Sequence, residues 1–99
     1  MFLIKNPNIL EENISESEIM IFNTETEEIH ILNSTATEIY FLLSEALSEN
    51  EVTKKFVDIH IKESYNGSCL TESDLIADVK NTIALLLNLN ILKTGEHNE

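Results

Sequence analysis

The residue types that most often carry chemistry are few in this chain and are not grouped. Histidine occurs three times and cysteine once, at His30, His60, His97 and Cys69. Their spacing shows no pairing of the kind that zinc sites use. We therefore expect no metal ion and no cofactor. For His30 in a strand and His60 in a helix, we expect partly exposed, hydrogen-bonded side chains.

The sequence also gives no support for a catalytic nucleophile or for a phosphate-binding loop. Cys69 precedes a predicted helix start, but no base or positive charge accompanies it. Serine and acidic residues are so abundant that a Ser-His-Asp set can be assembled without any spacing to recommend it. Neither Gly67 nor Gly95 follows a strand and opens a helix, as a phosphate-binding loop requires. We expect no catalytic residues, and a protein that is not an enzyme.

Charge is the strongest global property of the sequence. There are 6 Lys and Arg residues against 18 Asp and Glu, which gives a formal net charge of -12. Such a chain repels polyanions within about a Debye length, roughly 8 Å at physiological salt, so we expect no nucleic acid partner. Because the acids are scattered along the chain, solubility explains them best, and a basic partner remains an alternative.

Size and composition indicate one domain. With 99 residues, of which 42% are hydrophobic, the chain can bury a modest core. We predict that residues 1–92 form the domain and that residues 93–99 are a polar, frayed tail. The single cysteine cannot form an intramolecular disulfide, and no apolar run reaches the length of a signal peptide or of a membrane span. We expect a cytoplasmic protein without a membrane partner.

Short runs rich in Ile and Phe supply the first elements that would position a binding site. They predict strands at residues 2–4, 8–11, 19–23 and 29–33. A polar stretch of hairpin length, Thr24 to Glu28, connects the last two runs. We therefore predict that residues 19–23 and 28–33 form an antiparallel pair.

Three helices are predicted after Ser34, where the apolar period changes from two to 3.6. Each opens with a capping box: Thr35 with Glu38, Ser48 with Glu51, and Thr71 with Asp74. The predicted core face of the first helix is Ala36, Ile39, Leu43, Ala46 and Leu47, and that of the second is Val52, Phe56 and Ile59. We expect the second helix to run to about Tyr65 and to stop at Asn66-Gly67.

The third predicted helix carries more apolar surface than a two-layer contact requires. Its core arc is Leu75, Ile76, Val79, Ile83, Leu86 and Leu87. Leu85 and Leu89 lie beside that arc, in line with Asp78 and Thr82. This second row can bury against the sheet or bind a ligand.

An open strand edge is the feature that best predicts binding. If the strands form a meander, the strand at residues 28–33 lies at an edge and presents unpaired N–H and C=O groups. Its sequence has high strand propensity and no proline or lysine to discourage pairing with another extended chain. An edge that is already covered weighs equally with an edge that binds a partner, and the cover would be either Met1 to Lys5 or a second copy in a homodimer.

One set of residues runs through these elements in a recognisable order: Phe22-Asn23, Ile29 to Asn33, Thr35-Ala36, Ile39-Tyr40, Leu42-Leu43, Asp78-Val79, Leu86, Leu89 and Ile91-Leu92. Together they resemble the PqqD-like family, the RiPP recognition elements that bind leader peptides of ribosomally made, post-translationally modified peptides. The resemblance extends from about Asn8 to Leu92. Its most specific parts are Leu-Asn-x-Thr-Ala-x-x-Ile at the end of the last strand, and the Asp-Val pair.

The resemblance implies an α+β, winged-helix-like fold with a three-stranded antiparallel sheet followed by three helices. It also implies that a leader peptide adds as a strand to the third strand, rests against the third helix, and is handed to a modifying enzyme, often a radical SAM protein. Carried over by position, the implied peptide-binding residues are Glu28, Ile29, His30, Ile31, Leu32, Asp78, Thr82, Leu85 and Leu89. Val79, Ile83 and Leu86 are implied to be core.

The chain departs from the family pattern at three places. Glu27 replaces a turn glycine before the third strand, and Asn90 replaces a glycine near the chain end, which predicts longer or looser turns at both. The apolar positions of the second helix are shifted around Phe56. None of these departures touches the predicted edge strand.

Two other functions share parts of this pattern. A winged-helix DNA-binding regulator uses the same topology, but proteins that read DNA present a basic face, which a net charge of -12 does not favour. The remaining alternative is an acidic subunit that engages a basic protein surface without a leader peptide.

Overall fold

The structure is a computed structural model that describes residues 2–63 and 72–95. In this part of the chain the elements are β1 (Phe2–Lys5), β2 (Ile9–Asn13), β3 (Ile19–Asn23), β4 (Ile29–Leu32), α1 (Ser34–Leu42), α2 (Glu49–Glu63), α3 (Glu72–Asn88) and β5 (Leu92–Gly95). The strands β2, β3 and β4 form one antiparallel sheet, and β1 pairs with β5. The expected α+β class, with a three-stranded antiparallel sheet and three helices, is confirmed.

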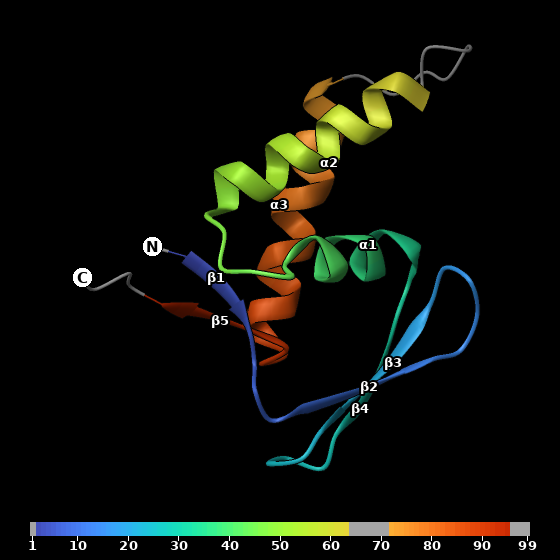
Figure 1. Ribbon diagram of the computed structural model, residues 1–99, viewed down its shortest axis with the longest axis vertical. Helices are drawn as coiled ribbons and strands as arrows, with labels where there is room; N and C mark the ends of the chain where they lie inside the picture. Colours follow the sequence, from blue (N-terminus) through green and yellow to red (C-terminus); the bar gives the residue numbers. More distant parts are fainter. Residues whose placement is uncertain (1, 64–71, 96–99) are drawn as a thin grey trace.

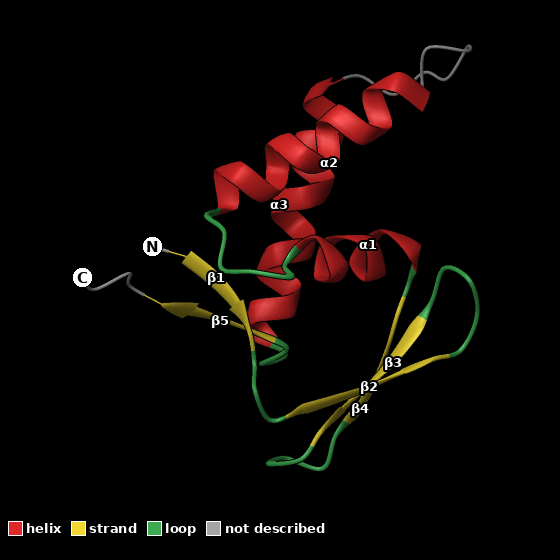
Figure 2. Cartoon of the chain, viewed as in Figure 1, coloured by secondary structure: helices red, strands yellow, loops and turns green. Residues whose placement is uncertain are grey.

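The three-stranded sheet lies on one side of α1, and the helices α2 and α3 lie on the other. Figures 1 and 2 show α1 between the sheet and the helices α2 and α3, which run side by side, while β1 and β5 lie near the C-terminal end of α3. One hydrophobic core joins these parts, with Ile21 of the sheet, Ile39 of α1, Val52 of α2 and Val79 of α3 among its fully buried side chains.

The predicted hairpin is present with the predicted strands. β3 pairs with β4 so that Phe22 lies opposite Ile29 and Ile19 lies opposite Leu32. Along β3 the side chains alternate between buried and partly buried, as expected for a strand with one face in the core. β2 is antiparallel to β3 on the other side, so the three strands form the meander on which the edge hypothesis depended.

Two turns use left-handed backbone at Glu27 and Asn90, where the resemblance implies glycine. Glu27 has φ 62° and Asn90 has φ 61°. Neither turn is loosened by the missing glycine, because both turns are closed by hydrogen bonds. The Glu27 N–H donates to the Asn23 carbonyl at 2.8 Å, and the Ile91 N–H donates to the Leu86 carbonyl at 2.9 Å. With the bond from Asn90 N–H to the Leu87 carbonyl, the second set is a Schellman motif that ends α3.

The start of α1 differs from the prediction. Asn33, not Thr35, is the N-cap residue, and its Oδ1 accepts a hydrogen bond from the Ala36 N–H at 2.9 Å. Asn33 retains an extended backbone, as an N-cap requires, whereas Thr35 already lies within the helix. The predicted Thr35 and Glu38 capping box is therefore wrong by two residues.

α1 is also shorter than its predicted apolar face. The helix ends at Leu42, so Leu43 and Leu47 are buried outside it and Ala46 is exposed. Leu47 instead forms a bridge with Leu3, in which the Leu3 N–H donates to the Leu47 carbonyl at 2.7 Å. The helical period therefore ends earlier than the sequence suggests, and Leu47 is held by backbone pairing with β1 instead.

α2 begins as predicted but presents a rotated face. The Ser48 N–H donates to Glu51 Oε1 at 3.0 Å and the Glu51 N–H donates to Ser48 Oγ at 3.2 Å, which confirms the capping box. Val52 and Phe56 are buried as expected, but the buried face turns toward Val57. Ile59 is therefore exposed, and its predicted core role is wrong. The predicted end at Tyr65 and the stop at Asn66-Gly67 lie outside the described residues.

α3 is the central core helix that the sequence predicts. Leu75, Val79, Ile83 and Leu86 are buried, and the other two members of the predicted arc, Ile76 and Leu87, are partly buried against them. The predicted Thr71 cap and Cys69 lie outside the described part of the chain.

The region after α3 is a strand where the sequence predicts a frayed tail. Residues 93–95 belong to β5, in which Leu92 lies opposite Lys5 and Gly95 lies opposite Phe2. Polar composition alone predicts disorder, but β1 supplies backbone partners from the other end of the chain. Residues 93–95 of the predicted tail are therefore part of a paired strand.

Candidate functional site

β4 is an edge strand with one side open. It pairs with β3, and no other strand of the described residues pairs with it. Phe2–Lys5, which the sequence left as a candidate cover for this edge, pairs with β5 instead. That alternative is wrong for these residues, because β1 belongs to a separate two-stranded sheet with β5, and its Leu3 also bridges Leu47.

The hydrogen bonds of the hairpin determine which residues of β4 face the open side. The Asn23 N–H donates to the Glu28 carbonyl at 2.9 Å. In an antiparallel ladder, hydrogen-bonded and non-hydrogen-bonded pairs alternate. His30 and Leu32 are therefore the residues bonded to β3, and the N–H and C=O groups of Ile29 and Ile31 point to the open edge.

The side chains of β4 alternate between two environments. Leu32 is 4% exposed and belongs to the core, and His30 is partly buried on the same face. Ile29 and Ile31 are 59% and 64% exposed on the other face. The edge strand thus presents to solvent the side chains of Ile29 and Ile31 together with the N–H and C=O groups of the same two residues.

The inner face of β4 is fixed by α1. The Thr37 hydroxyl, itself buried, donates to the Leu32 carbonyl oxygen at 3.2 Å. His30 differs from the expectation of a hydrogen-bonded side chain, since its Nε2 is buried without a partner in the described structure. His60 does meet the expectation, because its Nε2 forms a hydrogen bond with Glu38 Oε2.

Tyr40 of α1 joins the helix to the sheet and to β1. Burial raises the pKa of its hydroxyl well above the usual range, and the side-chain hydrogen bond and charge of Glu11 raise it further. The Lys5 ammonium lies 4.3 Å from the centre of the Tyr40 ring, within the range of a cation–π interaction. These contacts from β1 and β2 hold α1 over the sheet and so help position β4.

The fold is that of a solved structure described as TbiB1 in complex with the TbiA(beta) leader peptide. The two chains superimpose with a TM-score of 0.69, covering 95% of this chain and 99% of that chain, at 16% sequence identity. This chain has the TbiB1 fold. No protein-family model and no curated protein matches the sequence.

The outer face of the sheet continues the apolar surface of β4. Phe22 lies opposite both Ile29 and Leu10, and Met20 lies opposite Ile31. Leu10 is 62% exposed, while Met20 and Phe22 are partly buried. This face was not among the predicted sites, although the alternation of Met20 and Phe22 with Ile19 and Ile21 along β3 marks it.

The helix-side candidates lie on the flank of α3. Asp78 is exposed, Leu85 is 52% exposed, and Thr82 and Leu89 are partly buried. Val79, Ile83 and Leu86 are buried, which agrees with their implied core role. The contact of β4 with α1 is more extensive than its contact with α3. Of the strand candidates, the structure therefore directs only the backbone groups of Ile29 and Ile31 to the open edge. The helix candidates lie in a row on a separate element.

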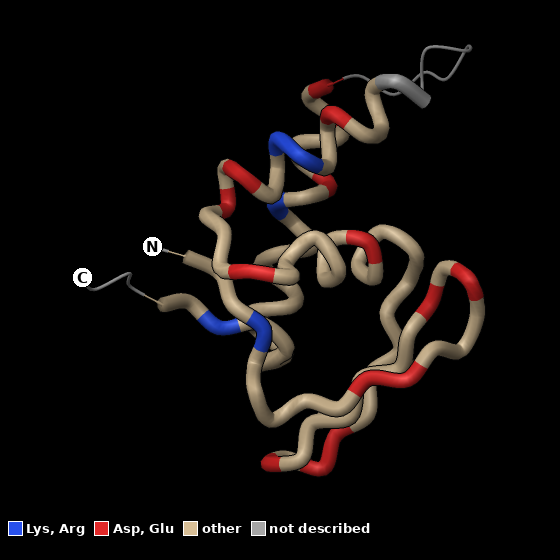
Figure 3. Tube along the Cα trace, viewed as in Figure 1, with Lys and Arg blue, Asp and Glu red and all other residues tan. Residues whose placement is uncertain are grey.

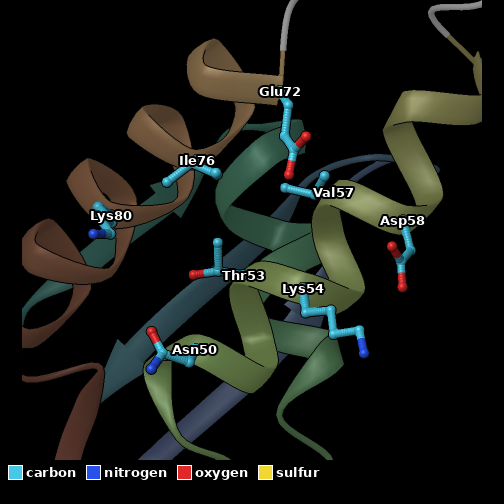
Figure 4. A pocket seen from close by; sticks show the side chains of 8 residues that line it. All are labelled: Asn50, Thr53, Lys54, Val57, Asp58, Glu72, Ile76 and Lys80. Atoms are coloured by element: carbon cyan, nitrogen blue, oxygen red, sulfur yellow. The ribbon is translucent and has the colours of Figure 1, made fainter.

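A second candidate site is a pocket of about 430 Å³ between α2 and α3. Figure 4 shows that Lys54 and Lys80 lie on opposite sides of it and point away from each other. Binding sites for small ligands usually have a few polar groups that converge on one point. Because these side chains diverge, we assign no site here.

Within residues 2–63 and 72–95, no three His, Cys, Asp or Glu side chains are grouped so that they could hold a metal ion. None of the helices in the same ranges is both long and apolar enough to span a membrane.

Proposed function

We propose that this chain binds the leader peptide of a ribosomally synthesised, post-translationally modified peptide by strand addition to β4. The observation that carries the proposal is the open edge of β4, where Ile29 and Ile31 direct their backbone groups away from β3. Added support comes from the TbiB1 fold, because that structure is a complex with a leader peptide.

In strand addition, the backbone would supply affinity and the side chains would supply specificity. Main-chain pairing with Ile29 and Ile31 supplies affinity that depends little on sequence. Alternate side chains of the added strand would lie on the outer face, beside Ile29 and Ile31. The others would point toward the helices, where Asp78, Thr82, Leu85 and Leu89 form the proposed second wall.

Ordering a disordered leader limits the affinity. Coupled folding costs part of the gross interaction energy, so we expect a dissociation constant between about micromolar and tens of nanomolar. Isothermal titration calorimetry with the cognate leader tests this expectation. Absence of saturable binding at high micromolar peptide would contradict the proposal.

We propose that a separate protein carries out the modification of the precursor peptide. In this scheme the chain is not an enzyme; it presents the precursor to a modifying enzyme, for which the family resemblance suggests a radical SAM protein. Holding only the leader leaves the remainder of the precursor accessible.

The location of the site is tested by an NMR titration with a candidate leader. We expect the amide signals of Glu28 to Asn33 and of Asp78 to Leu89 to shift together. Shifts confined to other elements would contradict β4 addition. A mobility-shift assay at low salt checks the DNA-binding alternative, for which the acidic sheet predicts no complex.

A homodimer through β4 is the competing use of the same edge. Two copies would pair their β4 strands and leave none for a peptide. Size-exclusion chromatography with light scattering distinguishes the cases, since we expect a monomer that remains monomeric at high protein concentration.

A further inference from the structure

The part of the chain that contains the three-stranded sheet carries negative charge and no positive charge. Between Lys5 and Lys54 the sequence has no lysine or arginine. The sheet and its turns hold seven glutamates, at positions 11, 12, 16, 18, 25, 27 and 28. Figure 3 shows these acids on the strands and turns of the sheet, with the basic residues on other elements.

Two of these glutamates are fixed at the start of the open edge. Glu27 and Glu28 are both exposed. Their position is set by the closed turn, in which the Glu27 N–H and the Glu28 carbonyl both bond to Asn23. Any strand that pairs with Ile29 and Ile31 therefore has one end beside these two carboxylates.

The two residues that follow supply an apolar pattern. Ile29 and Ile31 are well exposed on the outer face of the sheet. Residues directly opposite one another in a sheet have their side chains on the same face and interact. A peptide residue opposite either isoleucine thus contributes most to binding if its side chain is aliphatic or aromatic.

Resting on the proposed function, we propose that β4 selects a peptide of defined chemistry. The peptide carries apolar side chains at two alternate positions, opposite Ile29 and Ile31, and lysine or arginine at the end beside Glu27 and Glu28. Opposite charges across strands attract and like charges repel, so an acidic peptide end is rejected. A second copy of this chain fits poorly, because its own β4 has no lysine or arginine to place beside Glu27 and Glu28.

Display of random peptides of about 12 residues tests this pattern without knowledge of the cognate leader. The purified protein is compared with a Glu27→Lys/Glu28→Lys variant. The matched control is Glu45→Lys/Glu49→Lys, which changes the net charge equally at exposed positions outside the sheet. Amide spectra of all three proteins establish that each is folded.

We expect the wild-type protein and the control to enrich alternating apolar residues with a nearby lysine or arginine. The Glu27→Lys/Glu28→Lys variant should enrich aspartate or glutamate at the same place. For one selected peptide, Lys→Glu substitution at that place should weaken binding to the wild type by about five- to twenty-fold, since each cross-strand charge pair changes binding by a few fold. The difference should shrink in high salt.

Different results would overturn the proposed selectivity and the proposed strand addition. If enriched peptides shift the β4 amides but show no charge preference, or an acidic one, the proposed selectivity is overturned and strand addition stands. If neither the enriched peptides nor the cognate leader shifts the β4 amides, strand addition is overturned and the selectivity with it.

Discussion

The Asn23 N–H donates a hydrogen bond of 2.9 Å to the carbonyl oxygen of Glu28, and this bond sets the phase of β4. It places His30 and Leu32 against β3 and leaves Ile29 and Ile31 facing the open edge. A reversed phase would offer the backbone of His30 instead, whose side chain lies on the inner face. The proposed strand addition at β4 therefore depends on the geometry of the turn that precedes it.

Ile31→Pro should weaken leader binding without unfolding the protein. Proline removes an N–H that faces the open edge, where sheets tolerate this residue. We expect affinity to fall at least about ten-fold, measured by calorimetry, with a cooperative thermal transition retained. Ile31→Val keeps the N–H and should bind nearly as the wild type does. Unchanged affinity in a folded Ile31→Pro protein would show that the edge is not used.

Leu85→Ser tests the helix wall. Because Leu85 is 52% exposed, its loss should change the free energy of unfolding by less than about 0.5 kcal/mol. If the added peptide rests against α3, affinity should fall several-fold. Ile59→Ser is the matched control, since Ile59 is 41% exposed on α2, away from the sheet. Equal effects of the two substitutions would remove Leu85 from the site.

Glu27→Gly should stabilise the protein. A side chain in left-handed backbone costs roughly 1–2 kcal/mol, while glycine loses more chain entropy on folding, so the net gain should be about 1 kcal/mol. Urea denaturation measures the change. Glu25→Gly in the same turn is the control and should destabilise, because Glu25 does not have positive φ. A loss of stability in Glu27→Gly would show that the turn depends on the glutamate side chain.

Asn33→Ala should destabilise the protein by about 1 kcal/mol, because it removes the side-chain acceptor for the Ala36 N–H. Thr35→Ala should change stability by less than half as much, since Thr35 is not the cap. Thermal or urea denaturation of the two variants compares them directly. A larger effect at Thr35 would restore the cap that the sequence pattern predicts.

Tyr40 should make stability depend on alkaline pH. Burial, aided by Glu11, raises the pKa of its hydroxyl above the ordinary value of 10.0, so the folded state favours the neutral form. This contribution is fully present below about pH 10 and is lost as the pH rises toward the folded-state pKa. Urea denaturation across this range should show a decline that Tyr40→Phe reduces. An equal decline in both proteins would assign the effect to other groups.

The sequence by itself determined the elements whose signals are local. The capping box of Ser48 and Glu51, the core arc of α3 and the β3–β4 hairpin depend on residues close in the chain, and each was predicted within a few positions. The edge position of β4 was also predictable, given a meander.

Only the tertiary structure decided the features that depend on distant partners. Lys93 to Gly95 form a strand because β1 supplies hydrogen-bonding groups from the other end of the chain. Ile59 is exposed because α2 packs through a face rotated toward Val57. Periodicity defines a stripe along one element but contains no information on which neighbour that stripe meets. For the same reason, the outer apolar face and the edge-facing amides of Ile29 and Ile31 became visible only once the register of β2, β3 and β4 was fixed.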